Sequence, residues 1–249
     1  ALMRKLADME ALILQQQSAM IQQQNTITRL NATVAAQNSV IAMLTNTQGQ
    51  ASGFVPVNEY TRYQLGFMLN GTIRTINSTG NVGQFTSLAL TPAGFPVITY
   101  YDVTNGDLKL AVCADATCSS GTTTRTIDST NNVGQYTSLA LTTAGFPVIS
   151  YYDITNLDLK LAVCTDATCS SGTTIRTIDS TNNIGQYTSL ALTAAGFPVI
   201  SYYDLTNGDL KLAVCADATC SSSTVIRTID STGDVGRYTS LALTTAGFP

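Results

Sequence analysis

The sequence predicts a mainly β protein made of repeated four-stranded units, preceded by an α-helical coiled coil. Two observations support this fold class. A unit of 51 residues recurs down most of the chain, and such a period is the signature of a repeat architecture. Each copy places one glycine at the same point: Gly83, Gly134, Gly185 and Gly236. Before the copies begin, apolar residues recur at every seventh position, which is typical of a coiled coil.

Residues 1–48 carry the heptad pattern. All a positions are apolar: Leu6, Ile13, Met20, Ile27, Val34 and Ile41. The d positions mix apolar residues with Gln16, Gln23 and Gln37. A helix packed on its own domain would drift off a seven-residue register, whereas a supercoil keeps it. We therefore expect a parallel oligomerisation stalk formed by the a-position residues, with a helix docked on its own repeats as the alternative.

The composition of this helix bears on the number of strands. β-branched residues at a with Leu at d suit a dimer. The long, weakly charged helix, rich in Gln, Asn and Thr, resembles the stalks of trimeric viral and phage fibres and bacterial trimeric adhesins, in which polar core layers are frequent. That resemblance favours a homotrimer over a dimer.

Residues 49–71 separate the stalk from the repeats. Helical periodicity stops at Gly49–Gly53, and residues 54–71 match no repeat but contain large apolar groups such as Phe54, Tyr60 and Phe67. We interpret 49–71 as a linker and collar.

Residues 72–249 contain the repeats, with full units at about 84–134, 135–185 and 186–236 and partial units at both ends. In the copy from Gln135 to Gly185, alternation and turn residues predict strands at 137–141, 147–153, 159–164 and 174–179, with 180–185 as a connector. Small and apolar residues on both faces of these strands predict sheets packed between two neighbours. Blades of a β-propeller fit this pattern, and a β-solenoid is the alternative.

Several segments of the repeat also carry a family resemblance. Ser150–Asp153, Asp158–Leu161 and Thr137–Leu141, with a Gly-x-Pro turn at Gly145, resemble the repeats of bacterial and viral extracellular β-propellers, which are loosely related to sialidase-type Asp-box propellers. The Asp-box itself is not reproduced, because Ser180–Tyr187 lacks its Asp and the Trp that follows. The resemblance implies the fold of residues 72–249 and says little about activity.

The partial units suggest that the array is longer. Thr72–Asn77 matches the fourth strand of a unit, and Arg237 opens another unit that stops at Pro249 inside its second strand. We expect the N-terminal strand to complete a last blade and the native chain to continue with more repeats.

The six cysteines lie in three copies of one loop and form local pairs: Cys113 with Cys118, Cys164 with Cys169, and Cys215 with Cys220. Zinc needs about four N or S ligands, and the chain contains no His, so we predict disulfides over metal. Disulfides point to an extracytoplasmic location. The sequons at Asn31, Asn70 and Asn77 are possible glycosylation sites in that compartment.

Two repeated polar patterns invite a functional interpretation. The segment Asp102–Asp107, repeated at Asp153 and Asp204, resembles a calcium loop, but a hairpin turn is the favoured interpretation. The arginines at the equivalent positions Arg125, Arg176 and Arg227 suggest a carboxylate clamp. We expect them to lie on the outer edges of the blades instead, and to pair with a nearby Asp128, Asp179 or Asp230.

Tyrosine pairs recur at Tyr100-Tyr101, Tyr151-Tyr152 and Tyr202-Tyr203. They are candidates for sugar-stacking platforms. At a period of two, one Tyr of each pair must face the core, so at most half are available to a glycan.

The sequence contains few of the residue combinations that enzymes use for catalysis. Without His there is no Ser-His or Cys-His pair, and the only glutamates are Glu10 and Glu59, although glycoside hydrolysis usually needs paired carboxylates. The glycines are isolated turn formers rather than a phosphate-binding loop. We predict that the protein is not an enzyme and has no catalytic residue, metal site or cofactor.

Charge and hydropathy limit the partners. The net charge is −4 with 12 basic residues and no cationic face for nucleic acid, and no apolar run reaches the length of about 18 residues that spans a bilayer. We predict an adhesive or structural subunit of an extracellular, cell-surface or virion-surface fibre. Its partners would be copies of itself, cell-surface glycans or other fibre and capsid proteins. A lectin-like carbohydrate-binding module is the alternative, and a degenerate sialidase-like enzyme is the third hypothesis.

Overall fold

The computed structural model describes residues 73–249, which belong to the second of the two units into which the chain divides, Thr72–Pro249. Predictions on earlier residues lie outside this part. They are the stalk 1–48 with its a-position residues, the linker and collar 49–71, and the sequons at Asn31 and Asn70. No helix within residues 73–249 is long and apolar enough to cross a membrane.

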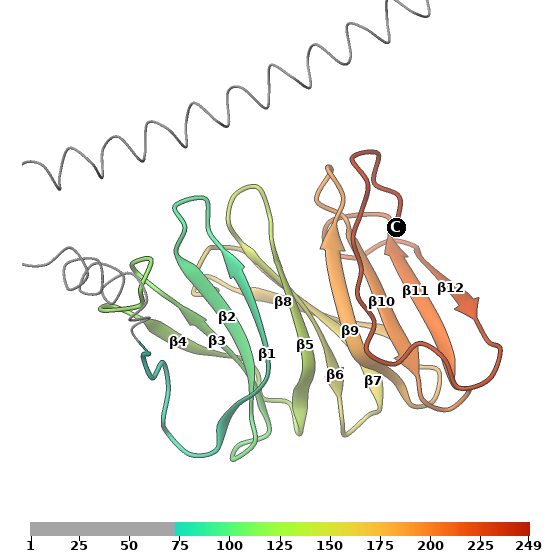
Figure 1. Cartoon of the computed structure of the whole chain (residues 1–249), viewed down its shortest axis with the longest axis horizontal. Helices are drawn as coiled ribbons and strands as arrows, with labels where there is room; N and C mark the ends of the chain where they lie inside the picture. Colours follow the sequence, from blue (N-terminus) through green and yellow to red (C-terminus); the bar gives the residue numbers. More distant parts are fainter. Residues whose placement is uncertain (1–72) are drawn as a thin grey trace, which may run out of the picture. The chain divides into compact units, whose positions relative to one another are not determined.

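The described residues form three four-stranded antiparallel sheets in which strands that follow one another along the chain are neighbours (Figure 1). The first sheet contains β1 (Val82–Leu90), β2 (Pro96–Asp102), β3 (Asp107–Val112) and β4 (Thr123–Asp128). The second contains β5 (Val133–Leu141), β6 (Pro147–Asp153), β7 (Asp158–Cys164) and β8 (Thr173–Asp179). The third contains β9 (Ile184–Leu192), β10 (Pro198–Asp204), β11 (Asp209–Cys215) and β12 (Thr224–Asp230).

Each sheet is made from one copy of the repeat, so the prediction of propeller-like four-stranded blades is confirmed. The ladders stay within a copy, whereas a solenoid would pair strands between copies. The predicted strand 147–153 has the observed bounds, but the predicted connector 180–185 is wrong at its end, because β9 already begins at Ile184. The Ile184 amide donates to the Leu157 carbonyl at 3.0 Å. This bond joins the first residue of β9 to a turn of the preceding blade.

The core lies between successive sheets. Between the first two sheets, Leu108 and Leu110 of β3 belong to one cluster with Val133 and Tyr151 of the second blade. The central strand β6 is buried along its whole length, as expected for a sheet covered on both faces. Burying one such Leu or Val side chain contributes about 1.5–3 kcal/mol, so the contact between blades is the main source of stability.

The repeated glycine marks the closest approach between blades. A Cβ on Gly134 would lie 2.7 Å from Leu108 Cα, and a Cβ on Gly185 would lie 2.7 Å from Leu159 Cα. Both glycines also have positive φ, 104° and 99°, which other residues rarely adopt. The 51-residue glycine is therefore a packing requirement. At Gly83, which no strand precedes within the described residues, a Cβ would have no neighbour within 4 Å.

The first strands β1, β5 and β9 are joined to one another by side-chain bonds. Thr137 Oγ1 donates to the Phe85 carbonyl at 3.1 Å, and the Leu139 amide donates to Ser87 Oγ at 3.0 Å. Thr188 and Leu190 repeat both bonds on the second blade. This line of contacts identifies the inner side of the array.

The hairpin turn after the second strand has one conformation in all three blades. Asp153 accepts hydrogen bonds from the Asn156 amide at 3.0 Å and from Asn156 Nδ2 at 2.9 Å. The next residue has positive φ: 75° at Gly106 and Gly208, but 65° at Leu157. Leu157 therefore adopts the left-handed conformation that glycine supplies in the other two copies, and the turn forms without an Asn-Gly pair.

The two partial units do not form strands. Residues 73–77 and 237–249 are irregular, so the expected strand at 72–77 and the strands expected after Arg237 are wrong for the described residues. Thr239 Oγ1 still donates to the Tyr187 carbonyl at 2.8 Å, as in a first strand. Of the residues that form the second strand in the other units, this unit contains the equivalent of the first one, Pro249.

Candidate functional site

The three predicted disulfides are present, Cys113–Cys118, Cys164–Cys169 and Cys215–Cys220. Each closes a loop organised by one aspartate. The carboxylate of Asp115 accepts hydrogen bonds from the amides of Thr117, Ser119 and Ser120. These bonds hold the pKa of Asp115 well below its usual range, and Asp166 and Asp217 are held in the same way.

The repeated arginines are exposed on the outermost strands, as expected, but the predicted ion pairs are wrong. Within the part of the chain that the structure describes, Arg125, Arg176 and Arg227 make no ion pair. Asp128 and Asp179 point into the junctions between blades and pair with lysines instead. The arginines lie on separate blades and do not converge on a clamp.

The tyrosine pairs are buried on both residues, with exposed fractions of 0–4%, so none is a sugar platform. The two hydroxyls bond in opposite directions. Tyr151 donates to Asp128 of the preceding blade at 2.6 Å, and Tyr152 donates to Asn183 before the following blade at 2.7 Å. The middle pair therefore connects its blade to both neighbours.

The candidate calcium loop is a hairpin turn, because the oxygens of its first aspartate are occupied by donors of the turn itself. Within residues 73–249 no group of three or more acidic, Cys or His residues is placed to hold a metal ion. The sequon at Asn77 is half-buried, and its Nδ2 atom, which would carry a glycan, donates to the Tyr100 hydroxyl at 2.9 Å.

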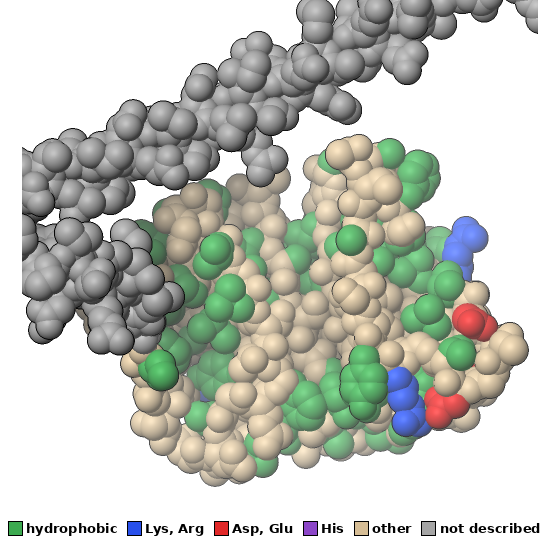
Figure 2. All heavy atoms as spheres, in the orientation of Figure 1, with side chains coloured by type: hydrophobic (Ala, Val, Ile, Leu, Met, Phe, Trp, Pro, Cys, Tyr) green, Lys and Arg blue, Asp and Glu red, His purple; other side chains and the backbone are tan. Residues whose placement is uncertain are grey.

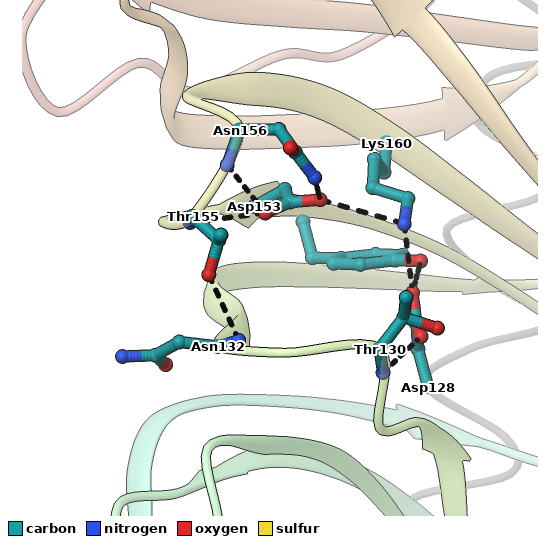
Figure 3. A network of polar contacts seen from close by, with 8 residues as sticks. Asp128, Thr130, Asn132, Asp153, Thr155, Asn156 and Lys160 are labelled. Atoms are coloured by element: carbon teal, nitrogen blue, oxygen red, sulfur yellow. Dashed lines mark hydrogen bonds and ion pairs between the residues drawn. The ribbon is translucent and has the colours of Figure 1, made fainter.

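A buried polar network lies at the junction between the first and second blades (Figure 3). Lys160 Nζ lies 3.1 Å from Asp128 Oδ2 and 3.5 Å from Asp153 Oδ2. The Lys160 side chain is 11% exposed and the two carboxylates 1%. Burial raises the pKa of Asp128, but hydrogen bonds from Tyr151, Thr130 and Lys160 outweigh it, and the pKa lies below its ordinary value.

The same network recurs at the next junction. Lys211 Nζ lies 3.1 Å from Asp179 Oδ2 and 3.9 Å from Asp204 Oδ2, and Tyr202 donates to Asp179 at 2.8 Å. The sequence did not reveal these clusters, because their members are far apart in the chain and come from different blades.

An aromatic row runs along the inner strands, with one ring from each repeat: Phe85, Tyr136, Tyr187 and Tyr238. Successive ring centroids are 4.5, 4.5 and 4.6 Å apart, and the rings are tilted to each other by 50–56°. All four residues have positive φ, between 51° and 58°. Such φ values are outliers for bulky side chains. They coincide with a shift of strand register, as between Gln135 and Ser138, and such bulges re-aim side chains.

The row lines a shallow groove of about 230 Å³, together with the threonine that follows each ring. Thr137 and Thr188 are committed to bonds between blades, and neighbouring rings pack on one another. The exposed parts of the rings and the tyrosine hydroxyls remain for a ligand. Burial raises the pKa of Tyr136 to about 12, which keeps its hydroxyl a donor at neutral pH. The Gln-Tyr-Thr-Ser motif can be read in the sequence. The bulge that brings its tyrosine ring into the row cannot.

A second cleft of about 420 Å³ lies against the last sheet. Its lining includes Leu210, Leu212 and Ile229, whose counterparts Leu108, Leu110 and Ile127 are core residues at the first junction. This cleft is therefore a blade-packing face. Figure 2 shows that charged side chains on the pictured face are few and gather at the end of the array formed by the third blade, while the rest is apolar or uncharged.

Neither a protein-family model nor a curated protein matches the chain. Among solved structures, an α-L-arabinofuranosidase from Lactobacillus brevis is similar at 11% identity and a TM-score of 0.40, over 58% of this chain and 53% of that one. A bifunctional GH43-CE protein from Bacteroides eggerthii is similar at 14% identity and a TM-score of 0.38, over 58% of this chain and 19% of that one. The chain thus spans about half and about a fifth of their lengths, and the likeness concerns the fold alone.

The comparison corrects one prediction. We predicted that the protein is not an enzyme, but the two similar structures are an α-L-arabinofuranosidase and a bifunctional GH43-CE protein, and that prediction is withdrawn. No Asp-box protein is among these two structures. The three disulfides indicate a secreted or extracellular protein.

Proposed function

We propose that the protein binds carbohydrate outside the cell, through the groove of the aromatic row. The observation that carries this proposal is the backbone strain at all four rings, where φ lies between 51° and 58°. A bulky residue in this conformation costs on the order of 1–3 kcal/mol, and glycine would avoid that cost. A ring kept at such a position in every repeat suggests a role beyond packing.

The chemistry of the groove suits a sugar. An aromatic ring offers an apolar face to the C–H side of a pyranose or furanose ring, and a tyrosine hydroxyl offers a hydrogen-bond donor beside it. The volume of about 230 Å³ is below the usual range of about 300–1,000 Å³ for drug-sized ligands. The groove therefore fits a small unit of a longer glycan.

The periodicity of the row favours a chain-like ligand. Rings about 4.5 Å apart give several equivalent contacts along one line, and a glycan offers several equivalent sugar units. Linked contacts raise the overall affinity through effective concentration. The adhesive role that the sequence predicted would follow if several chains act together, and their oligomerisation through residues 1–48 remains a proposal.

The test uses the full chain and a panel of soluble oligosaccharides, α-L-arabinofuranosyl oligosaccharides included, with binding measured by calorimetry. Tyr187→Gly removes a central ring and suits the positive φ of 53°. We expect this variant to bind about tenfold more weakly, equivalent to about 1.4 kcal/mol. Tyr187→Phe is the matched control, because Phe85 occupies the same place in the first blade, and it should bind within about threefold of the wild type.

Three results would count against the proposal: no oligosaccharide binds, Tyr187→Gly binds as well as the wild type, or both variants lose binding equally. Denaturant unfolding of each variant separates loss of the ring from loss of the fold. Reducing-sugar release is measured on the same panel, so that hydrolysis is detected together with binding.

A further inference from the structure

We propose that Lys160 and Asp128 form an intramolecular amide bond that joins the first blade to the second, and that Lys211 and Asp179 form its counterpart at the next junction. Each junction brings an amine, a carboxyl group and a second carboxyl group together in a buried site. This inference stands on the junction geometry and is independent of the proposed carbohydrate binding.

The geometry places the reacting groups in contact. Lys160 Nζ is 3.1 Å from Asp128 Oδ2, so the amine is in direct contact with the carboxyl group that it would attack. Tyr151 donates to the same oxygen at 2.6 Å, and the Thr130 amide donates to Asp128 Oδ1 at 3.0 Å. Donors on both oxygens polarise the carboxyl group and stabilise the negative charge that develops during attack.

Burial favours the amide over the ion pair. The Asp128 and Asp153 carboxylates are each 1% exposed, and taking charges out of water is costly even when they are paired. Two carboxylates and one ammonium also leave a net negative charge in the site. An amide replaces one carboxylate and the ammonium by a neutral group, and the released water moves to bulk solvent.

The step balances without an external reagent. The Lys160 ammonium first gives one proton to the Asp128 carboxylate, across the 3.1 Å between them, which leaves a neutral amine and a carboxylic acid. The amine attacks Asp128 Cγ and a C–N bond forms. Asp153, 3.5 Å from Lys160 Nζ, takes a second proton from the nitrogen and returns it to the departing hydroxyl group as the C–O bond breaks. One water leaves, no atom is oxidised or reduced, and Asp153 is the catalytic residue of the step.

The start of the first blade supplies an internal control. Asn77 there occupies the position that Asp128 has one repeat later, and Asn77 Nδ2 donates to the Tyr100 hydroxyl. Lys109 Nζ is turned to Thr126 Oγ1 at 2.7 Å. The amine and the side-chain carbonyl group are not in contact, so the proposal assigns no bond to Lys109.

The experiment is intact-mass spectrometry of the full chain, reduced and denatured so that disulfides do not contribute. Two amide bonds lower the mass by two waters, about 36 Da below the sequence mass. Lys160→Arg keeps the positive charge but cannot form the bond, so its deficit should fall to about 18 Da, and Lys160→Arg with Lys211→Arg should abolish it. Lys109→Arg should keep the full deficit.

Asp153→Ala tests the catalytic role and should lose the deficit of its own junction alone. Peptide mapping should recover a branched peptide that contains both Lys160 and Asp128. A wild-type mass equal to the sequence mass, or a deficit that survives in the double arginine variant, overturns the proposal and leaves the junctions as ion pairs.

Discussion

The junction between the first and second blades and the start of the first blade are built from equivalent residues, yet they are held in different ways. At the junction, Asp128 accepts the Tyr151 hydroxyl and pairs with the buried Lys160. At the start of the first blade, the neutral Asn77 donates to the Tyr100 hydroxyl and accepts the Thr79 amide, and Lys109 turns to a threonine. The difference teaches that the lysine of the repeat turns to this position where that position carries a carboxylate.

Packing separates the two sites as well. Val82, Leu88 and Leu90 of the first blade are half-buried or exposed, whereas Val133 and Leu139 of the second blade are core residues. Equivalent repeat positions therefore differ in burial, because among residues 73–249 a sheet precedes the second blade and none precedes the first.

The largest expected effect is at the repeated glycine. Gly185→Ala should lower the free energy of unfolding by about 4 kcal/mol, because a Cβ would lie 2.7 Å from Leu159 Cα and the backbone has no space to yield. Gly83→Ala has a similar positive φ of 95° but no neighbour within 4 Å, and should cost only about 1 kcal/mol. Denaturant unfolding of the pair measures the difference. Equal losses would show that backbone conformation, and not the approach of the blades, explains the glycine.

The second largest effect on stability is expected at the lysines of the repeat. Lys160→Met leaves two buried carboxylates without their cation and should cost about 3 kcal/mol. Lys109→Met removes only a hydrogen bond to an exposed threonine and should change stability by less than about 0.5 kcal/mol. Urea unfolding of both variants compares the two sites directly, and a similar loss in both would contradict the distinction drawn between them.

The sequence was sufficient for the features that lie within one repeat. The four strands, the disulfide loops and the hairpin turns follow from alternation, Cys spacing and turn residues close together in the chain. The Asp128, Tyr151 and Lys160 cluster could not be predicted, because it needs the geometry of neighbouring blades. The pairing predicted for Arg176 and Asp179 is wrong for the same reason. It was based on their proximity in sequence, but Arg176 is exposed and Asp179 is buried between blades.

The aromatic row shows a second limit. Tyr151 and Tyr152 drew attention as a pair, but both are buried, and the single Tyr187 lies in the groove. Its direction depends on a register shift, and no residue type in the motif marks that shift.

Acid should act equally on the three disulfide loops, because the loop aspartates recur unchanged. The pKa of Asp166 is lowered from 3.8 by hydrogen bonds from Ser171 and Ser170, so its contribution is present above about pH 4 and is lost as the pH falls through the lower folded value. Asp166→Asn should be less stable at pH 7 and lose less on acidification. Asp115→Asn should behave alike, and a large difference between the two would show that the loops, too, depend on their position in the array.

The smallest effect concerns the turn, where the first blade has Gly106 and the second has Leu157. Leu157 is 38% exposed and adopts φ 65°, so replacing it by glycine relieves strain and gives up little packing. Leu157→Gly should raise the free energy of unfolding by about 0.5 kcal/mol, a balance between relieved strain and the greater freedom of glycine in the unfolded chain. The reverse change, Gly106→Leu, should lower stability by about 1 kcal/mol, because the turn backbone has φ 75° and Asn131 O lies 3.4 Å from the new Cβ. Thermal and urea unfolding measure both variants. If Leu157→Gly is destabilising instead, Leu157 makes contacts that outweigh its strain, and the middle turn is then adapted to leucine.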